Sequence, residues 1–248
     1  MKPELRIFPD LEALSRAAAE AFAGAAARAS EARGRFLVAI SGGGTPLRTY
    51  ALLASRTYRN RLDWARTYVF WADERCVPPD QAESNYGEAF RSFLGRVPIP
   101  TENLLRMRGE MQPESGVADY AQTLKRFAAT GKDWPRFDLV LLGLGADGHT
   151  ASLFPGSPTR VRAPVLAVSA EYQGRPARRM TLTPPVFNDA RQVLFLVSGS
   201  GKARALASVL EESHQPERFP AQRIQPQAGK VVFMVDHTAA GGLRQEMR

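Results

Sequence analysis

The chain has 248 residues and a net charge of +8, and its 44% of hydrophobic residues can bury a sizeable core, which excludes a disordered protein. Its Lys and Arg residues are scattered, with one dense basic run at Arg175, Arg178 and Arg179, so we expect them to attract small anionic substrates and not nucleic acid. The single cysteine, Cys76, excludes a disulfide framework and a thiolate-rich zinc site, and it fits a reducing compartment such as the cytoplasm.

The predicted elements alternate between helices and short apolar strands. Met1–Arg6 lacks the apolar run of a signal peptide, and nowhere do ~20 apolar residues follow one another, so we expect no leader and no membrane segment. Asp10 can cap a helix that runs to about Ser30, and Phe36–Ile40 is an apolar run of strand length. Further strands are expected at 68–71, 139–142, 193–197 and 231–235, with weaker candidates at 165–168 and 179–182, and helices at 84–94, 114–129 and 201–210.

This order of elements predicts the fold class. Strands that alternate with helices form a mainly parallel central sheet with helices on both faces. Because the chain has no internal repeat and no convincing linker, we expect residues 1–248 to form a single doubly wound, Rossmann-like α/β domain. Ligands of such sheets bind outside the carboxyl ends of the strands, so the loops after the strands are the places to look for chemistry.

The loop after the first apolar run, Ser41–Pro46, is rich in glycine. The three glycines Gly42–Gly44 let the backbone come close to an anion, and Pro46 suits the first turn of a helix. Free amides at such a helix start, together with the hydroxyls of Ser41 and Thr45, would form a phosphate cradle. A flexible turn is the alternative. The loop is not a Walker P-loop, because no Lys-Ser/Thr pair follows the glycines.

Charged residues lie beside three other predicted strands. Asp73–Arg75 directly follows an aromatic strand, and burying such charges is costly without partners, so the segment is either a surface cluster or part of a site. Arg179 enters a weak strand and could equally be a surface charge. Lys202 lies between a buried strand and a helix, in a glycine-rich segment where a lysine is a natural phosphate ligand.

The most informative loop is Gly143–Pro155. It contains a literal G-x-G-x-x-G, but that fingerprint must open a long crossover helix, and Pro155 ends any helix early, so we do not expect a dinucleotide site. Asp147 precedes His149 in the same loop, and a nearby carboxylate can orient an imidazole and stabilise its charged form. Because histidine accepts and returns a proton near neutral pH, this pair predicts proton-transfer chemistry.

Several other kinds of catalysis lack support in the sequence. There is no G-x-S-x-G nucleophile elbow and no H-E-x-x-H zinc motif. His214 and His237 lie in no comparable loop, and the scattered histidines offer no recognisable metal site, so we expect neither a metal nor a cofactor. Hydrolysis or isomerisation of a small phosphorylated molecule by proton transfer remains.

These motifs resemble those of the 6-phosphogluconolactonases, and they are spread over most of the chain in that family's order. The motifs are Ser41–Pro46, Trp71–Arg75, Ser84–Tyr86, Gly143–Pro155, Arg179–Thr183 and Gly201–Ala203. The resemblance implies a fold shared with the glucosamine-6-phosphate deaminases. It also implies metal-independent hydrolysis of 6-phosphoglucono-δ-lactone to 6-phosphogluconate in the pentose phosphate pathway.

The resemblance further implies roles for individual residues. His149 would be the general base that activates water against the lactone carbonyl and then reprotonates the ring oxygen, and Asp147 would orient it. Arg75 would face the reacting end of the substrate and stabilise negative charge there. The phosphate would be held by Gly43, Gly44, Thr45, Arg179 and Lys202, with Arg178 as an alternative to its neighbour.

Two other functions are compatible with parts of this pattern. An amino-sugar-phosphate deaminase or isomerase would share the fold, but in the resembling deaminases an acid stands where this chain has Leu153–Pro155. A non-catalytic sugar-phosphate sensor would keep the phosphate cradle but would not need Asp147 and His149 together. For the enzyme we expect a small sugar-phosphate lactone as partner and a monomer or weak homo-oligomer.

Overall fold

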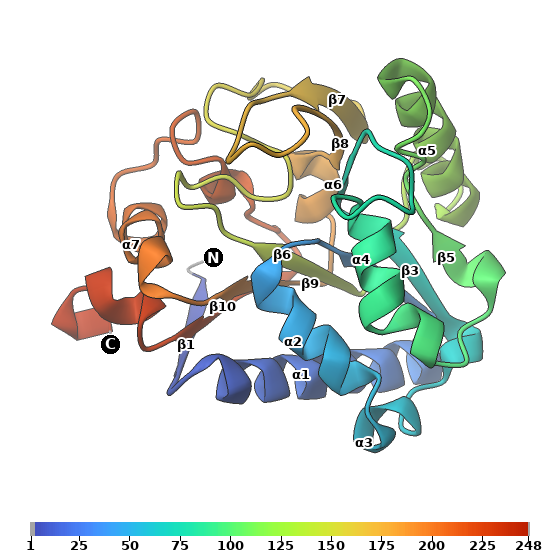
Figure 1. Cartoon of the computed structure of the whole chain (residues 1–248), viewed down its shortest axis with the longest axis horizontal. Coiled ribbons are helices and arrows are strands. Elements are labelled where there is room, and N and C mark those ends of the chain that lie inside the picture. The colour runs from blue at the N-terminus through green and yellow to red at the C-terminus, as the bar shows by residue number, and fades with distance from the viewer. Residues whose placement is uncertain (1–2, 248) are drawn as a thin grey trace.

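The computed structural model describes residues 3–247 and contains two β-sheets (Figure 1). Met1, Lys2 and Arg248 lie outside this range. The first two belong to Met1–Arg6, the segment in which we expect no signal peptide. The larger sheet has the order β1-β10-β9-β6-β2-β3-β5, and every adjacent pair of its strands is parallel. Its strands are β1 (Glu4–Phe8), β2 (Phe36–Ile40), β3 (Thr67–Trp71), β5 (Leu104–Leu105), β6 (Leu139–Gly143), β9 (Gln192–Val197) and β10 (Lys230–Asp236).

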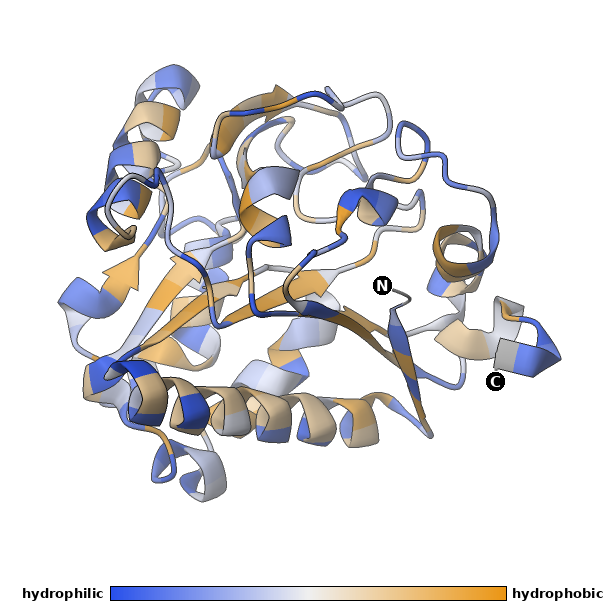
Figure 2. Cartoon of the chain, turned by 180° about the vertical axis from the view of Figure 1, so that it is seen from behind, coloured by the Kyte–Doolittle hydropathy of each residue, from blue (hydrophilic) through white to orange (hydrophobic). Residues whose placement is uncertain are grey.

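Helices lie on both faces of the larger sheet, so the predicted α/β class is confirmed. In the view of Figure 1, α1 and α2 lie below this sheet, and α6 lies above it with the smaller sheet. Figure 2 shows the same layers from behind, with strands of the large sheet coloured as hydrophobic. The helices are α1 (Leu11–Arg33), α2 (Gly44–Leu53), α3 (Arg56–Arg59), α4 (Asn85–Ser92), α5 (Pro113–Phe127), α6 (Pro184–Asn188) and α7 (Ala203–Glu211).

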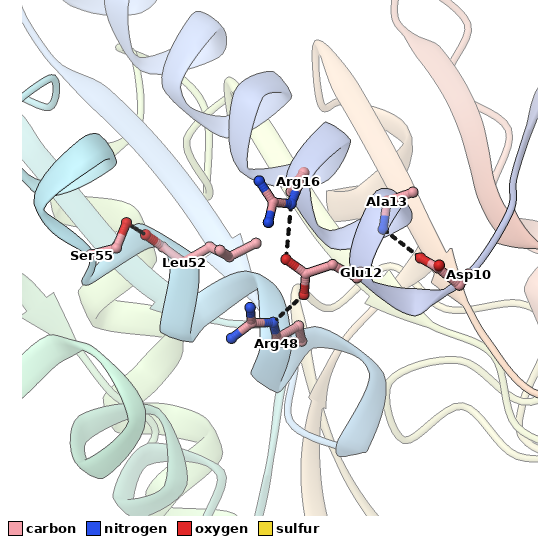
Figure 3. A network of polar contacts seen from close by, with 7 residues as sticks. All are labelled: Asp10, Glu12, Ala13, Arg16, Arg48, Leu52 and Ser55. Atoms are coloured by element: carbon pink, nitrogen blue, oxygen red, sulfur yellow. Dashed lines mark hydrogen bonds and ion pairs between the residues drawn. The ribbon is translucent and has the colours of Figure 1, made fainter.

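Helix α1 begins and ends where capping chemistry dictates. The Asp10 side chain accepts a hydrogen bond from the Ala13 amide at 2.8 Å, as predicted for the N-cap (Figure 3). The helix ends at Arg33, three residues later than predicted, because Gly34 adopts the left-handed φ of 71° that closes it. Glu12 pairs with both Arg16 and Arg48 and so links α1 to α2 at the surface (Figure 3). Solvent screens exposed pairs of this kind, so the buried alanine-rich face dominates the packing of α1.

The continuous apolar runs are strands of the large sheet, as predicted. All residues of β2 and β9 are buried, which is typical of parallel strands covered on both faces. At the end of β3 the Tyr120 hydroxyl of α5 accepts from the Trp71 amide at 2.8 Å and lies 3.0 Å from the Trp71 carbonyl. Helix α5 is thereby fixed against the strand that leads into Asp73.

The smaller sheet corrects the predicted layout. Its order is β4-β8-β7, formed by β4 (Asp73–Arg75), β7 (Val165–Ser169) and β8 (Arg178–Leu182) in antiparallel pairs. The weak strands at 165–168 and 179–182 therefore exist, but they lie outside the parallel sheet. Asp73–Arg75 was expected to follow a strand as a loop, and it is instead a short strand that pairs with a segment about a hundred residues later. Within residues 3–247, no helix is long and apolar enough to cross a membrane.

Candidate active site

One cavity lies at the carboxyl ends of the parallel strands, where the topology predicts ligand binding. Its volume is about 280 Å³, close to the lower limit of about 300 Å³ for small-molecule sites. Seven of the eight predicted site residues line it: Gly43, Gly44, Thr45, Arg75, His149, Arg179 and Lys202. The eighth, Asp147, does not line the cavity but contacts His149. The structure thus brings all eight together, while the role of each stays a prediction.

His149 is held in one orientation by its own loop. Its Nδ1 lies 2.5 Å from Asp147 Oδ1, and its carbonyl accepts from the Gly145 amide at 2.8 Å. With Nδ1–H donated to Asp147, the neutral imidazole leaves Nε2 as a proton acceptor. Burial opposes ionisation of Asp147, but the hydrogen bond and charge of His149 outweigh it and lower the carboxyl pKa. Asp147 therefore stays a carboxylate that accepts the hydrogen bond from Nδ1 and holds the imidazole in place.

Two aromatic rings complete the surroundings of the imidazole. The Phe154 ring centroid lies 4.5 Å from that of His149, and Tyr172 meets the imidazole edge-on at 4.6 Å. The Arg179 guanidinium lies over the Phe154 ring, 5.1 Å from its centroid. These contacts restrict the position of His149 and place a buried cation beside it.

The loop that carries His149 is anchored to both sheets. The Thr150 hydroxyl donates to the Gly143 carbonyl at 2.8 Å, which ties the loop to the end of β6. The Ser152 hydroxyl donates to Asp73 at 2.7 Å, and its amide donates to Thr181 at 3.3 Å, so the loop also bonds to β4 and β8. Turns and a short bridge follow His149 in place of a long helix, in agreement with the prediction against a dinucleotide fingerprint.

The glycine loop opens helix α2, which begins at Gly44. Gly43 has a φ of 103°, a conformation that side-chain-bearing residues rarely adopt. Its amide already donates to Glu88 at 3.3 Å, so Gly43 shapes the cradle while its N–H is engaged elsewhere. The amides of Gly44 and Thr45 occupy the first helical positions, where no intrahelical acceptor exists. These two amides are the ones that the helix start offers to an anion.

Glu74 and Arg75 are buried rather than part of a surface cluster, which decides between the two alternatives. Glu74 is 1% exposed and accepts four hydrogen bonds, from the amides of Arg75, Asn85 and Tyr86 and the hydroxyl of Ser84. Burial raises the pKa of Glu74 to about 7, against the effect of these hydrogen bonds. Arg75 is 7% exposed and donates to the Glu83 carbonyl at 2.6 Å, while its Nε has no partner among the described residues.

Strand pairing decides which arginine of the Arg178–Arg179 pair faces the cavity. Arg75 and Arg179 are opposite one another in β4 and β8, and side chains opposite one another lie on the same face. Arg179 is 3% exposed, and its Nη2 has no partner among residues 3–247. Arg178 is exposed on the opposite face and lines a separate small cavity beside Cys76. Burial lowers the pKa of Arg179 and that of Lys202, as expected where cations are desolvated.

Sequence reasoning missed other residues of the cavity. They are Asn85, Tyr172, Gln173 and Arg175, whereas Asp73 belongs to the segment Asp73–Arg75 that was weighed as part of a site. Asn85 donates to the Asp73 carbonyl at 2.9 Å and packs so closely on Gly42 that a side chain there would collide with it. The motif Ser84–Tyr86 was a signal for Asn85, whereas nothing in the sequence set Tyr172 apart.

The remaining histidines lie elsewhere. His214 lines a different cavity beside β10, and His237 is exposed after that strand. Within the described part of the chain, no three His, Cys, Asp or Glu side chains gather closely enough to hold a metal ion. The donors that face the cavity are instead cations and helix-start amides, a set that suits an anion.

Comparisons with known proteins identify the family of this chain and agree with its α/β fold. A sequence model of the family described as glucosamine-6-phosphate isomerases/6-phosphogluconolactonase matches residues 9–233. The chain belongs to this family. It is 40% identical over 214 residues to a 6-phosphogluconolactonase of Synechocystis, covering 86% of each chain.

Solved structures show the same fold. The 6-phosphogluconolactonase of Trypanosoma brucei superposes with a TM-score of 0.86 at 27% identity, over 98% of this chain and 99% of the other. A monomeric glucosamine-6-phosphate deaminase superposes with a TM-score of 0.83 at 21% identity, over 96% and 99% of the two chains. At that identity the deaminase shows a shared fold alone, so the two activities must be separated by the residues of the site.

Proposed function

We propose that this chain hydrolyses 6-phosphoglucono-δ-lactone to 6-phosphogluconate, with His149 as the general base and no covalent intermediate. The observation that carries the proposal is the Asp147–His149 pair, 2.5 Å apart, beside a cavity lined by cations and helix-start amides. The similarity to proteins named 6-phosphogluconolactonase supports the choice of substrate.

The phosphate would bind where positive charge and free amides meet. Gly44 and Thr45 would supply backbone amides, and Arg179 and Lys202 would supply charge-assisted hydrogen bonds. Gly43 would contribute its open backbone conformation, because its amide is engaged by Glu88. Binding the phosphate at this end would direct the lactone ring toward His149.

The chemical step needs one base and one water. His149 Nε2 would take a proton from water as the oxygen of that water bonds to the lactone carbonyl carbon. Arg75 would stabilise the negative charge that forms on the carbonyl oxygen. When the bond between the carbonyl carbon and the ring oxygen breaks, the imidazolium would return its proton to the ring oxygen. The product is an open-chain acid, which loses its proton to water.

The deaminase alternative has less support, because this chain has no acid in the segment after His149 where the deaminases would need one. Phe154 packs against His149 there, and its neighbours in the chain, Leu153 and Pro155, carry no acid. Asp73 lines the cavity, but it accepts a hydrogen bond from Ser152. A non-catalytic sensor would have no use for an oriented proton acceptor such as His149.

We infer as well that the chain acts as one domain. Both sheets supply residues to the same cavity, since Arg75 and Arg179 come from the smaller sheet and His149 follows a strand of the larger one. Because residues of one chain line the cavity, a monomer or weak homo-oligomer suffices for the proposed reaction. We expect the enzyme to act in the cytoplasm.

The test is the loss of freshly made lactone, with spontaneous hydrolysis subtracted. We expect His149→Ala to lower kcat about 100-fold or more, as removal of a general base does. Asp147→Asn should also lower kcat while KM changes little, because Asp147 orients the base and does not line the cavity. His237→Ala, at an exposed histidine outside the cavity, is the matched control. Wild-type turnover no faster than the spontaneous reaction would exclude the proposed activity.

A further inference from the structure

The tip of the β7–β8 hairpin forms an ordered wall of the cavity. Beyond the last paired residues of the two strands, Tyr172 and Arg175 form another antiparallel bridge, and the Arg175 amide donates to the Tyr172 carbonyl at 3.1 Å. The two residues between them, Gln173 and Gly174, have φ angles of 52° and 66°. Positive φ at both central positions is the feature of the type I′ turn that closes two-residue hairpins. The backbone of the tip therefore forms a defined two-residue turn.

Strand geometry determines where the Arg175 side chain points. Successive side chains of a strand alternate between faces, so Arg175 and Arg179, four residues apart, lie on one face, and Arg178 lies on the other. The bridge places Tyr172 on the same face as Arg175. Tyr172 packs against His149, and Arg175 lines the cavity, in agreement with this alternation.

Arg175, which is exposed at the mouth of the cavity, adds positive charge to Arg179 and Lys202, whose nearby counter-charges are Asp73 and Asp147. Burial is the main cause that lowers the pKa values of Arg179 and Lys202. Asp73 opposes this effect at Arg179 and Asp147 opposes it at Lys202, while the charge of Arg175 lowers both pKa values further. Within residues 3–247, no carboxylate forms an ion pair with Arg175, Arg179 or Lys202. Three cations that line one cavity and have no ion-pair partner attract an anion to the space between them.

We propose that Arg175 is a third cationic ligand of the substrate phosphate, delivered from the hairpin tip and acting with Arg179 and Lys202. This inference rests on the proposed function, because it assigns a phosphate-binding residue to the same site. Arg175 would form charge-assisted hydrogen bonds with a dianionic phosphate while Tyr172 keeps its contact with His149. The hairpin thus makes the site selective for phosphorylated over unphosphorylated lactones.

The test compares Arg175→Gln with Arg178→Gln, which removes the same charge from the same hairpin on the face away from the cavity. We would measure the dissociation constants of 6-phosphogluconate and inorganic phosphate by calorimetry, and the kinetics with the lactone and with unphosphorylated glucono-δ-lactone. Arg175→Gln should weaken 6-phosphogluconate and raise KM for the lactone about 10-fold or more, with kcat little changed. Arg178→Gln should stay close to the wild type, and Arg175→Lys should recover part of the loss.

Equal binding of 6-phosphogluconate by Arg175→Gln and Arg178→Gln would overturn the inference. It would also be overturned if Arg175→Gln raised KM for the unphosphorylated lactone as much as for the phosphorylated one. The binding measurements keep this result separate from the fate of the proposed function. If the wild type hydrolyses the lactone and Arg175→Gln binds phosphate normally, only the role of Arg175 is wrong. If the wild type fails to hydrolyse the lactone, phosphate binding by the variants still tests Arg175.

Discussion

Gly145 determines where the His149 ring can lie. A Cβ atom at this position would collide with the His149 ring and lie 2.5 Å from Asp147 Oδ1. The glycine therefore leaves room for the imidazole to rest on the backbone while its Nδ1 meets Asp147. Its role follows from a close approach and not from an unusual φ, because Gly145 is absent from the glycines with positive φ.

Replacing Gly145 by alanine should impair catalysis more than folding. We expect Gly145→Ala to displace the His149 ring and lower kcat at least about 10-fold, because a small misplacement of a catalytic group can cost about 100-fold. Thermal unfolding monitored by circular dichroism would show whether the variant remains folded. Gly24→Ala in α1 is the control, since its new Cβ meets only the flexible end of Arg28. Full activity in Gly145→Ala would show that the ring has room to move.

At the level of single residues, the sequence predicted those that directly follow an apolar run. His149 and Lys202 come after buried strands, and the topology takes both to one edge of the sheet. Tyr172 and Arg175 could not be found in this way, because they lie at the tip of a hairpin whose position depends on the long-range pairing of β8 with β4. Glu88 was also missed, because its contact with Gly43 joins two separate helices.

The short strand β4 links the anion site to the rest of the fold. Its alternation places Asp73 and Arg75 on the face that lines the cavity, and Glu74 on the other. Glu74 accepts from the first amides of α4, which fixes the start of that helix and hence Asn85. The buried carboxyl group of Glu74 thus positions one wall of the site.

The raised pKa of Glu74 predicts a specific dependence of stability on pH. Because the pKa is about 7 in the folded protein and 4.5 in the reference state, the folded state retains a proton that the unfolded chain has lost. The stability that this group provides is therefore complete below pH 4.5 and decreases as the pH rises through about 7.

Glu74→Gln cannot titrate and should lack this component. We expect the difference in the free energy of unfolding, wild type minus Glu74→Gln, to fall as the pH rises over that range and then to level off. Urea unfolding at a series of pH values measures the difference. Glu83→Gln removes an exposed carboxylate from the same segment and controls for the change in charge. An identical pH profile for both variants would contradict the assignment to Glu74.

At the level of elements, burial on both faces made the parallel strands predictable. Phe36–Ile40 and Val193–Val197 are continuous apolar runs because no face of these strands meets water. β1 was missed because it is a partly exposed edge strand in which charged and apolar residues alternate, and β5 because it has two residues. β4 was missed because its three residues are charged and their partners come from a distant segment.

The net charge of +8 and the cations of the cavity act together over the whole molecule. We expect kcat/KM for the phosphorylated lactone to fall several-fold as potassium chloride rises from about 10 mM to about 500 mM, because salt screens the attraction of a dianion. Glucono-δ-lactone, which carries no charge, is the control substrate and should show little change. A similar loss with both lactones would mean that salt acts on the protein and not on the approach of the substrate.

Arg75 and Arg179 are opposite one another in the smaller sheet, a placement that normally destabilises a pair of strands. Neither forms an ion pair within the described residues, and the nearby charge of Asp73 acts on Arg179 against the repulsion from Arg75. A phosphate bound at Arg179 would add a further counter-charge on this face of the sheet and shift the balance away from locally opened forms that proteases attack. The concentration of the phosphorylated lactone or its product would then affect the lifetime of the enzyme in the cell as well as its reaction rate.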